Sequence, residues 1–259
     1  MTLGVNIDHI AVLRQARQIN DPDVLDALGI VKRAGADQIT IHLREDRRHI
    51  QDDDAIAIVR HSALPVNIEC ALASDIVALM CDLRPHRITL VPEKREEVTT
   101  EGGLDILTHR DRLSATIRTF KEYDIAVSLF IEPDPQLIPV AKEIGADMVE
   151  LHTGAYANIF AMRHTNLSRT IFAVPSLMCS RHELDQRLQD EITKITQTAQ
   201  EARRYGLRVA AGHGLNYHNV SPMTTIQEIE ELNIGQSIIA RAVYTGLFDA
   251  VTDMKRLIS

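Results

Sequence analysis

Histidine and acidic residues stand at the ends of several short apolar runs in this sequence. The pairs spaced two residues apart are Asn6 and Asp8, Thr40 and His42, Asn67 and Glu69, Glu150 and His152, and Ala211 and His213. Because side chains alternate faces along a strand, the two members of a pair point to the same side. Imidazole and carboxylate groups around one cavity suit general acid–base catalysis. We expect a catalytic role for at least two of His42, Glu69, His152 and His213.

Basic and glycine residues follow the same runs. Arg14 and Arg17 come after the first run, Arg44, Arg47, Arg48 and His49 after the second, and Lys94 and Arg95 after the fourth. Arginine binds phosphate through paired, charge-assisted hydrogen bonds. Gly212, Gly214 and Gly235 lie near the last two runs, where backbone N–H groups can hold a phosphate. These residues predict a phosphorylated ligand, although nearby acids such as Glu45 and Asp46 can neutralise some of the arginines.

Other interpretations of the same residues remain open at this point. A histidine and carboxylate cluster also suits zinc, but Asp8 and His9 are adjacent and therefore point to opposite sides of a strand. An enzyme-bound imine needs an inward lysine, and none of the expected strands carries one. A single strand-end histidine or buried glutamate can also be a purely structural hydrogen-bond or ion-pair partner. We expect no bound metal.

The elements that must position these residues repeat one unit: an apolar run, a polar loop and a helical pattern. The expected strands are Leu3–Asp8, Gln38–Leu43, Pro65–Cys70, Arg87–Val91, Ala126–Ile131, Met148–Thr153, Arg208–His213 and Ser237–Ala240. The expected helices include 22–34, which starts at Asp21-Pro22, and 52–62, 74–83, 111–123, 135–144, 183–205, 223–232 and 243–257. Strands that alternate with helices pair in parallel through right-handed crossovers.

Eight such units in 259 residues match an α/β fold of the (β/α)8 TIM-barrel type. An open doubly wound sheet is the rival, but the sequence lacks both GxGxxG after the first strand and GxxxxGK[ST] anywhere. We predict one domain over residues 1–259. Residues 154–181, between the sixth strand and its helix, are far longer than a usual loop at this place. We predict that this inserted segment is an added helix, a lid or a subunit contact.

Composition narrows the class of protein. Lys and Arg number 28 against 36 for Asp and Glu, so the formal net charge is −8, which argues against a nucleic-acid partner. Three widely spaced cysteines fit a reducing compartment better than a disulfide framework. The first residues lack a signal-peptide pattern, and none of the apolar runs approaches a membrane span. We therefore expect a cytoplasmic protein with no membrane partner.

Several long motifs resemble those of the pyridoxine 5′-phosphate synthase family of vitamin B6 biosynthesis. They are GVNIDHIAVLRQAR (4–17), HLREDRRHI (42–50), NIEC (67–70), VPEKREEVTTEGGLD (91–105), SLFI (128–131), ELHTGAYA (150–157), GHGLNYHNV (212–220) and ELNIGQSIIARAV (231–243). They run in order through nearly the whole chain. REDRRHI and VPEKREEVTTEGG are the most specific of them.

The resemblance implies a ring-forming, transferase-class synthase. It would condense 1-deoxy-D-xylulose 5-phosphate with 3-amino-2-oxopropyl phosphate to give pyridoxine 5′-phosphate, phosphate and water, as a homo-octamer without a cofactor. His42 and Glu69 would accept protons and His213 would donate one. The implied substrate-binding residues are Asn6, Asp8, His9, Arg17, Arg44, His49, Thr99, Gly214, Gly235 and Gln236.

Two features depart from the family pattern. Gln236 occupies a position where the resemblance leads us to expect histidine, and the 154–181 segment is longer than in the family. A barrel metallohydrolase that uses the histidine and glutamate cluster is the alternative enzyme. A phosphate-metabolite binding protein without turnover is the alternative outside enzymes.

Overall fold

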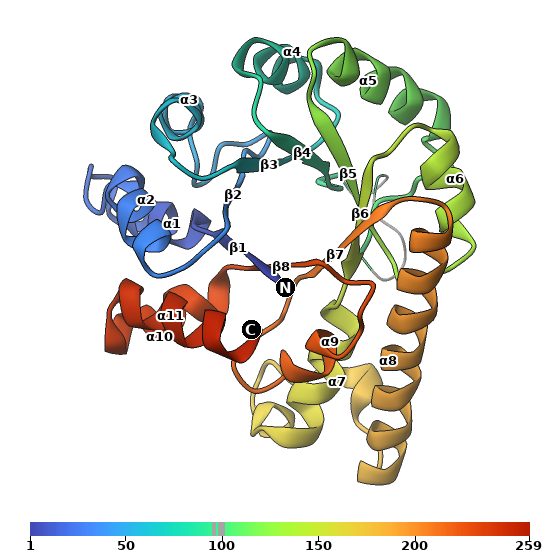
Figure 1. The fold of residues 1–259 in the computed structure, drawn as a ribbon. Helices are drawn as coiled ribbons and strands as arrows, with labels where there is room; N and C mark the ends of the chain where they lie inside the picture. Colours follow the sequence, from blue (N-terminus) through green and yellow to red (C-terminus); the bar gives the residue numbers. More distant parts are fainter. Residues whose placement is uncertain (95–96, 98–101) are drawn as a thin grey trace.

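The computed structural model describes residues 1–94, 97 and 102–259. Its strands form a closed parallel barrel in the order β1 to β8, and β8 pairs with β1. Figure 1 shows the strands at the centre with helices around them. The strands are β1 (Thr2–Asn6), β2 (Gln38–His42), β3 (Val66–Cys70), β4 (Arg87–Leu90), β5 (Ala126–Ile131), β6 (Met148–His152), β7 (Arg208–Gly212) and β8 (Glu231–Ile234). The TIM-barrel prediction is confirmed.

Helices cover the outside of the barrel. They are α1 (Asp8–Arg17), α2 (Val24–Arg33), α3 (Asp52–His61), α4 (Ser74–Leu83), α5 (Arg110–Glu122), α6 (Leu137–Glu143), α7 (Gly154–His164), α8 (Arg181–Arg204), α9 (Ser221–Thr224), α10 (Gln236–Thr245) and α11 (Leu247–Leu257). None of the helices in these described parts of the chain is both long and apolar enough to cross a membrane.

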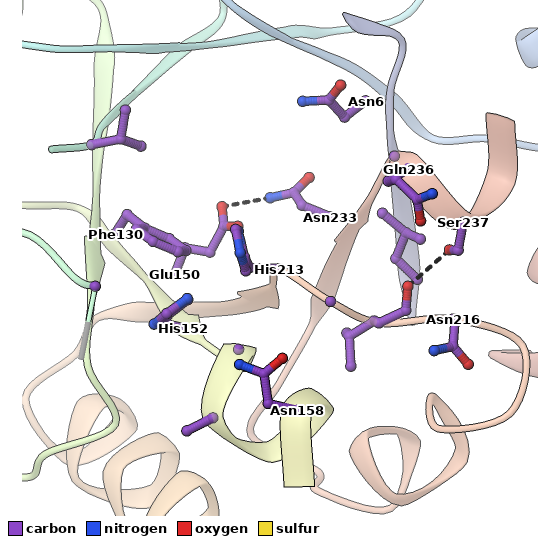
Figure 2. A pocket seen from close by; sticks show the side chains of 18 of the residues that line it. Asn6, Phe130, Glu150, His152, Asn158, His213, Asn216, Asn233, Gln236 and Ser237 are labelled. Carbon is purple, nitrogen blue, oxygen red and sulfur yellow. Dashed lines mark hydrogen bonds between the residues drawn. The ribbon is translucent and has the colours of Figure 1, made fainter. Parts of the chain in front are cut away.

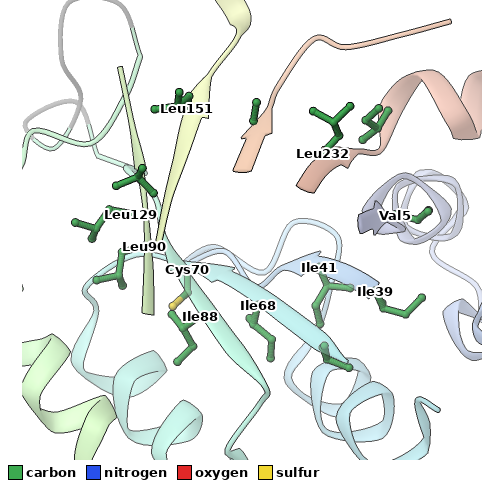
Figure 3. Close-up of a cluster of buried hydrophobic side chains, with 14 of the residues drawn as sticks. Val5, Ile39, Ile41, Ile68, Cys70, Ile88, Leu90, Leu129, Leu151 and Leu232 are labelled. Atoms are coloured by element: carbon green, nitrogen blue, oxygen red, sulfur yellow. The ribbon is translucent and has the colours of Figure 1, made fainter. Parts of the chain in front are cut away.

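Alternation along each strand separates an apolar outer face from a polar interior. Outward-facing Ile39 and Ile41 flank the inward-facing Thr40, and the outward side chains form the buried cluster that Figure 3 shows. Inside the barrel, Thr40 Oγ1 donates to Asn233 Oδ1 over 3.1 Å. Arg87 and Glu231, at the amino-terminal ends of β4 and β8, form a buried ion pair. Barrel interiors are usually filled by branched apolar residues, so this polar filling distinguishes the protein.

The last strand and the helices beside it differ from the prediction. Residues 237–240 are helical within α10, while β8 is Glu231–Ile234, which overlaps the predicted 223–232 helix. In a short apolar run, periodicity alone cannot distinguish a strand from a helix. Leu232 alternates with Glu231 and Asn233, which suits a strand between β1 and β7. Ile238 and Ile239 are buried on α10 instead.

Two further boundaries move close to the site. Helix α1 begins at Asp8 directly after β1, so Asp8 is in a first helical turn and does not share a strand face with Asn6. The predicted helix start at Asp21-Pro22 is also wrong, because α2 begins at Val24 and the Asp23 side chain accepts the Leu25 N–H. A side-chain oxygen that accepts an unpaired N–H group at a helix N-terminus stabilises the start of the helix: Asp23 does this for α2, and the Asn6 side chain accepts the Asp8 N–H at the start of α1.

The inserted segment is folded rather than open. It contains α7 and two short 3-10 turns at Leu167–Arg169 and Pro175–Leu177. Ile159, Met162, Leu177 and Leu184 form a small buried cluster that attaches the segment to α8. One part of α8 therefore covers the insertion, while the rest of this helix covers the barrel.

Candidate active site

A cavity of about 1110 Å³ opens at the carboxyl-terminal ends of the strands. In TIM barrels this is the end that carries the active site. Figure 2 shows Glu150, His152 and His213 on one side of the cavity and Gln236 and Ser237 on another. The predicted site residues that line it are Asn6, His9, His42, Arg44, Glu69, His213, Gly214, Gly235 and Gln236. The structure therefore brings together most of the residues predicted from the sequence.

His42 stands between two carboxylates at the end of β2. Its Nδ1 atom lies 3.8 Å from Glu69 Oε2, and its Nε2 atom lies 3.0 Å from Glu93 Oε1. Asp8 Oδ1 accepts the backbone N–H of His42 over 2.9 Å, so Asp8 holds the strand end without lining the cavity. The Glu93 carboxylate therefore orients the His42 ring through Nε2, while Nδ1 faces Glu69 across the cavity wall.

Burial controls the protonation of the carboxylates here. It raises the pKa of Glu69 well above its usual value, and the negative charges of Glu150 and Asp8 raise it further. Burial also raises the pKa of Asp8, to about 6. In Glu93 burial acts in the same direction, but hydrogen bonds from the His42 ring and the Glu45 N–H outweigh it and lower the pKa. Glu69 therefore ionises less readily than an exposed glutamate and binds a proton more tightly, whereas Glu93 favours its ionised form.

His213 follows β7 in a left-handed conformation, with φ of 78°. Its backbone carbonyl accepts the Thr153 hydroxyl over 2.7 Å, which holds this uncommon conformation. The expectation that His213 ends the strand is wrong, since β7 stops at Gly212. Burial lowers the pKa of His213, and the positive charge of His152 lowers it further.

Glycines line the side of the cavity nearest β7 and β8. A Cβ atom on Gly214 would lie 2.5 Å from Ala157 Cβ, and one on Gly235 would lie 2.8 Å from Asn6 Cβ. Gly235 follows β8 rather than preceding it, and it leads into the N-terminus of α10. Exposed N–H groups at a helix N-terminus bind phosphate. Gln236 and Ser237, in the first turn of α10, line the cavity at this point.

The remaining predicted residues lie elsewhere. Arg17 is exposed at the end of α1 and does not line the cavity, and Thr99 lies outside the described residues. His49 is not in the cavity wall, but its ring centroid lies 6.2 Å from that of His42. Burial and the neighbouring His42 lower the pKa of His49 to about 4. His9 lines the cavity with Nδ1 buried and without a hydrogen-bond partner in the described chain.

Some cavity residues carry no specific role predicted from the sequence, although His152 was among the expected catalytic candidates. Glu150 and His152 are recognisable in the sequence as a strand-end pair, whereas Glu93 stands after β4 among several charged residues and carries no distinguishing pattern. The inserted segment contributes Asn158, Val174, Ser176 and Leu177 to the cavity wall. Only the folded chain could reveal this contribution, because these residues are neither charged nor periodic.

The described residues, 1–94, 97 and 102–259, hold no group of three or more His, Cys, Asp or Glu side chains placed to bind a metal ion. Glu69 and Glu93 each lie against the His42 ring.

A family model described as "Pyridoxal phosphate biosynthesis protein PdxJ" matches residues 3–259. The chain belongs to this family. Over 258 residues it is 58% identical to the pyridoxine 5′-phosphate synthase of Sulfurovum sp. (strain NBC37-1), with 100% of both chains covered. It is 59% identical to the pyridoxine 5′-phosphate synthase of a Nitratiruptor species, in an alignment that covers 100% of this chain and 97% of the relative. These matches confirm the family membership that the sequence motifs predicted.

Solved structures agree on the fold of this PdxJ family member. A 3-hexulose-6-phosphate synthase structure superposes with a TM-score of 0.58 at 14% identity and covers 100% of both chains. A thiamine phosphate pyrophosphorylase from Pyrococcus furiosus superposes with a TM-score of 0.57 at 11% identity, covering 99% of this chain and 95% of the other. At such low identity these similarities support the barrel alone.

Proposed function

We propose that the cavity joins two phosphorylated substrates into a pyridine ring by general acid–base catalysis. The family and the full-length relatives make the chain a pyridoxine 5′-phosphate synthase, in preference to a metallohydrolase or a binding protein without turnover. Its reaction condenses 1-deoxy-D-xylulose 5-phosphate with 3-amino-2-oxopropyl phosphate and yields pyridoxine 5′-phosphate, phosphate and water. The observation that carries the proposal is that His42, Glu69 and His213 line one cavity.

The proton-transfer roles are those that the family resemblance implies, and the geometry and burial of the three residues support them. Ring closure requires an imine, loss of one substrate phosphate, a new carbon–carbon bond and losses of water, and these steps move protons. Glu69 and His42 are the proton acceptors that the family resemblance implies; their side chains lie 3.8 Å apart, and burial raises the pKa of Glu69, which makes its ionised form a stronger base. His213, which follows β7 and lines the same cavity, is the proton donor.

The phosphate groups are assigned to the two kinds of donor in the cavity. Arg44, after β2, is a side-chain donor for the deoxyxylulose phosphate, together with His9 on α1 and His49 beside His42. Asp8 supports this side, and Thr99 is proposed to join it. The amino-ketone phosphate meets Asn6, Gly214 and the Gly235-Gln236 N–H groups at the start of α10. Gln236 donates a neutral hydrogen bond there in place of an imidazole.

We also propose that the chain assembles with copies of itself, as an octamer. Val12 and Leu13 on α1 and Val243 and Tyr244 on α10 are exposed apolar residues, and α1 packs beside α10. Large apolar residues gathered on a surface mark contact sites. Arg17, exposed at the end of α1, belongs to the same region, and we assign it to a substrate site completed by assembly. A cytoplasmic location, one domain over 1–259 and catalysis without a cofactor complete the proposal.

The deciding experiment mixes the purified protein with both phosphorylated substrates. Pyridine absorbance and released inorganic phosphate should rise together, and neither should appear when one substrate is left out. Glu69→Gln serves as the control, since it keeps the shape of the site but removes a proton acceptor. Folded protein that forms neither product from verified substrates would overturn the proposal.

A further inference from the structure

A buried imidazole–carboxylate pair lies directly behind His213, and the reaction proposed above does not use it. His152 ends β6 and Glu132 follows β5; His152 Nδ1 is 3.1 Å from Glu132 Oε1. The side chains are only 8% and 11% exposed. Burying a charged pair is costly unless its geometry and remaining hydrogen bonds are satisfied, so such a pair needs a structural or functional reason.

The His152 ring contacts the His213 ring. Their centroids are 4.8 Å apart with an interplanar angle of 66°, and Phe130 packs on both rings at 4.9 and 6.1 Å. Figure 2 shows the three rings grouped on one side of the cavity. The edge-to-face contact means that the position of His152 limits how the His213 ring can turn.

His152 itself has almost no freedom to move. A Cβ atom on Gly154 would lie 2.6 Å from His152 Nε2, and one on Gly102 would lie 3.0 Å from Cε1. The Glu132 oxygen that meets His152 also accepts the Gly103 N–H over 2.6 Å. Since an ionised carboxylate only accepts hydrogen bonds, the Nδ1–H of His152 points at Glu132. The ring orientation is therefore determined from three sides.

The pair also acts on His213 through charge. A protonated His152 disfavours the protonated form of His213, and the Glu132 carboxylate favours it. Glu150 lies on β6, two residues before His152. Its side chain is directed toward Gly212 and accepts a hydrogen bond from Asn233. Helix α7 presents Gly154 and Ala157 to this region, and neither of them titrates. Among residues 1–94, 97 and 102–259, His152 and Glu132 are the charged or titratable groups that act electrostatically on the His213 ring.

We propose that Glu132 and His152 are positioning residues that hold the His213 imidazole in its proton-donating orientation and act on it through their charges. The inference rests on the proposed function, because it assumes that His213 is the proton donor. The catalytic site then includes a chain of contacts: the Gly103 N–H binds Glu132, Glu132 binds the His152 ring, and this ring packs on the His213 ring.

The first test is independent of turnover. NMR spectra of histidine-labelled, substrate-free protein give the titration midpoint of the His213 ring, assigned with His213→Asn. In His152→Asn the midpoint should rise by about half a unit or more, because an imidazole whose protonated form disfavours protonation of His213 is removed. Phe130→Leu is the matched control: it removes aromatic packing on the same ring without removing a titratable group, so the midpoint should move less than in His152→Asn. A midpoint that is the same in wild type and His152→Asn would overturn the inference.

The second test reads catalysis. His152→Asn and Glu132→Gln should each lower kcat on the order of 10-fold with KM for both substrates nearly unchanged. Glu132→Gln keeps an acceptor for the Gly103 N–H, so it separates charge from folding. In His152→Asn the alkaline limb of the kcat–pH profile should move to higher pH. Glu143→Gln, which breaks an exposed ion pair with Arg110, should leave kcat unchanged.

The outcomes separate the two ideas. Wild-type protein that forms no product contradicts the proposed function, while the NMR titration still measures whether His152 acts on His213. Active wild-type protein with an unmoved pH limb and wild-type kcat in both variants contradicts the inference alone.

Discussion

Three carboxylates, Asp8, Glu69 and Glu150, lie buried at or beside the cavity, and burial raises the pKa of each. A buried carboxylate with a raised pKa is a stronger base once ionised, so it accepts a proton from a substrate more readily. Burial also makes these carboxylates costly to ionise. The same burial therefore affects both the proton transfers and the free energy of unfolding. Two predictions belong to this scale.

Removing single proton carriers should separate turnover from binding. Glu69→Gln and His213→Asn keep the size and hydrogen-bonding capacity of the side chains but abolish their titration. We expect turnover to fall on the order of 10²-fold or more while substrate affinity is kept. Steady-state kinetics and equilibrium binding of each substrate measure the two quantities. Wild-type rates in both variants would remove these residues from the proton-transfer steps.

The raised carboxylate pKa values predict how stability depends on pH. The pKa of Glu150 is about 7 in the folded protein against an ordinary 4.5, since burial and the charge of Glu231 disfavour its ionised form. Its contribution to stability is therefore fully present below about pH 4.5 and is lost as the pH rises through about 7. Asp8 acts in the same direction, with a pKa of about 6 against 3.8.

Glu150→Gln should consequently stabilise the substrate-free protein at about pH 8, on the order of 1–3 kcal/mol, and change little at about pH 4. Glutamine can still accept the hydrogen bond that Asn233 donates over 2.7 Å. Denaturant unfolding at the two pH values, at one protein concentration, measures the effect. A variant that is less stable than wild type at the higher pH would contradict the assignment.

At the scale of elements, the site depends on how closely the segments after the strands approach one another. The turn after β7 lies against α7, and the segment after β8 lies against Asn6 at the end of β1. Glycine allows both approaches because it has no side chain. The inserted segment then closes one wall of the cavity with Ser176 and Leu177.

Gly214→Ala tests the approach of the β7 turn to α7. The new Cβ would lie 2.5 Å from Ala157 Cβ, at a φ of 85°. We expect a loss of about 1–3 kcal/mol in the free energy of unfolding and weaker binding of the amino-ketone phosphate.

Gly246→Ala is the matched control for this change. Gly246 has a φ of 81° but no atom within 4 Å of the added Cβ, so it reports the backbone cost alone. Denaturant unfolding compares the variants, and Ala157→Gly should partly restore Gly214→Ala. Equal losses for Gly214→Ala and Gly246→Ala would mean that close packing at the turn is unimportant.

At the scale of the whole molecule, charge and apolar surface are distributed unevenly. The chain has a net charge of −8, yet Arg44 and the N-terminus of α10 face the cavity. The net charge is a sum over the chain and is uninformative about the field inside one cavity. On the outside, Val243 and Tyr244 are 71% and 90% exposed on α10.

Charged substitutions on that surface should reduce assembly. Val243→Asp combined with Tyr244→Asp places two carboxylates where apolar side chains would meet a second copy, and buried unpaired charges are costly. We expect a shift to smaller species in sedimentation velocity with an unchanged circular dichroism spectrum. Phe172→Asp, on the inserted segment, is the control for an exposed apolar residue elsewhere. A double variant that sediments like wild type would exclude this face from the assembly.

The periodicity of the sequence was enough to predict the barrel and the meeting of His42, Glu69 and His213. Alternation in runs such as QITIH and VNIEC encodes which side chains face inward, and parallel strands in a closed barrel all end at one mouth. These are local patterns combined with a general rule of topology, so they can be read without knowing any particular contact.

Other features depended on contacts between distant segments. The sequence of residues 237–240 suits a strand as well as a helix. Residues 231–234 form the eighth strand because they pair with both β1 and β7. Glu93 meets His42 across 51 positions, and His152 meets Glu132 across 20. Such partners are selected by the geometry of the closed barrel, because burial rewards whichever groups satisfy one another's hydrogen bonds. The local sequence pattern therefore predicts which face of a helix or strand is buried, whereas only the tertiary structure determines which residues pack against that face.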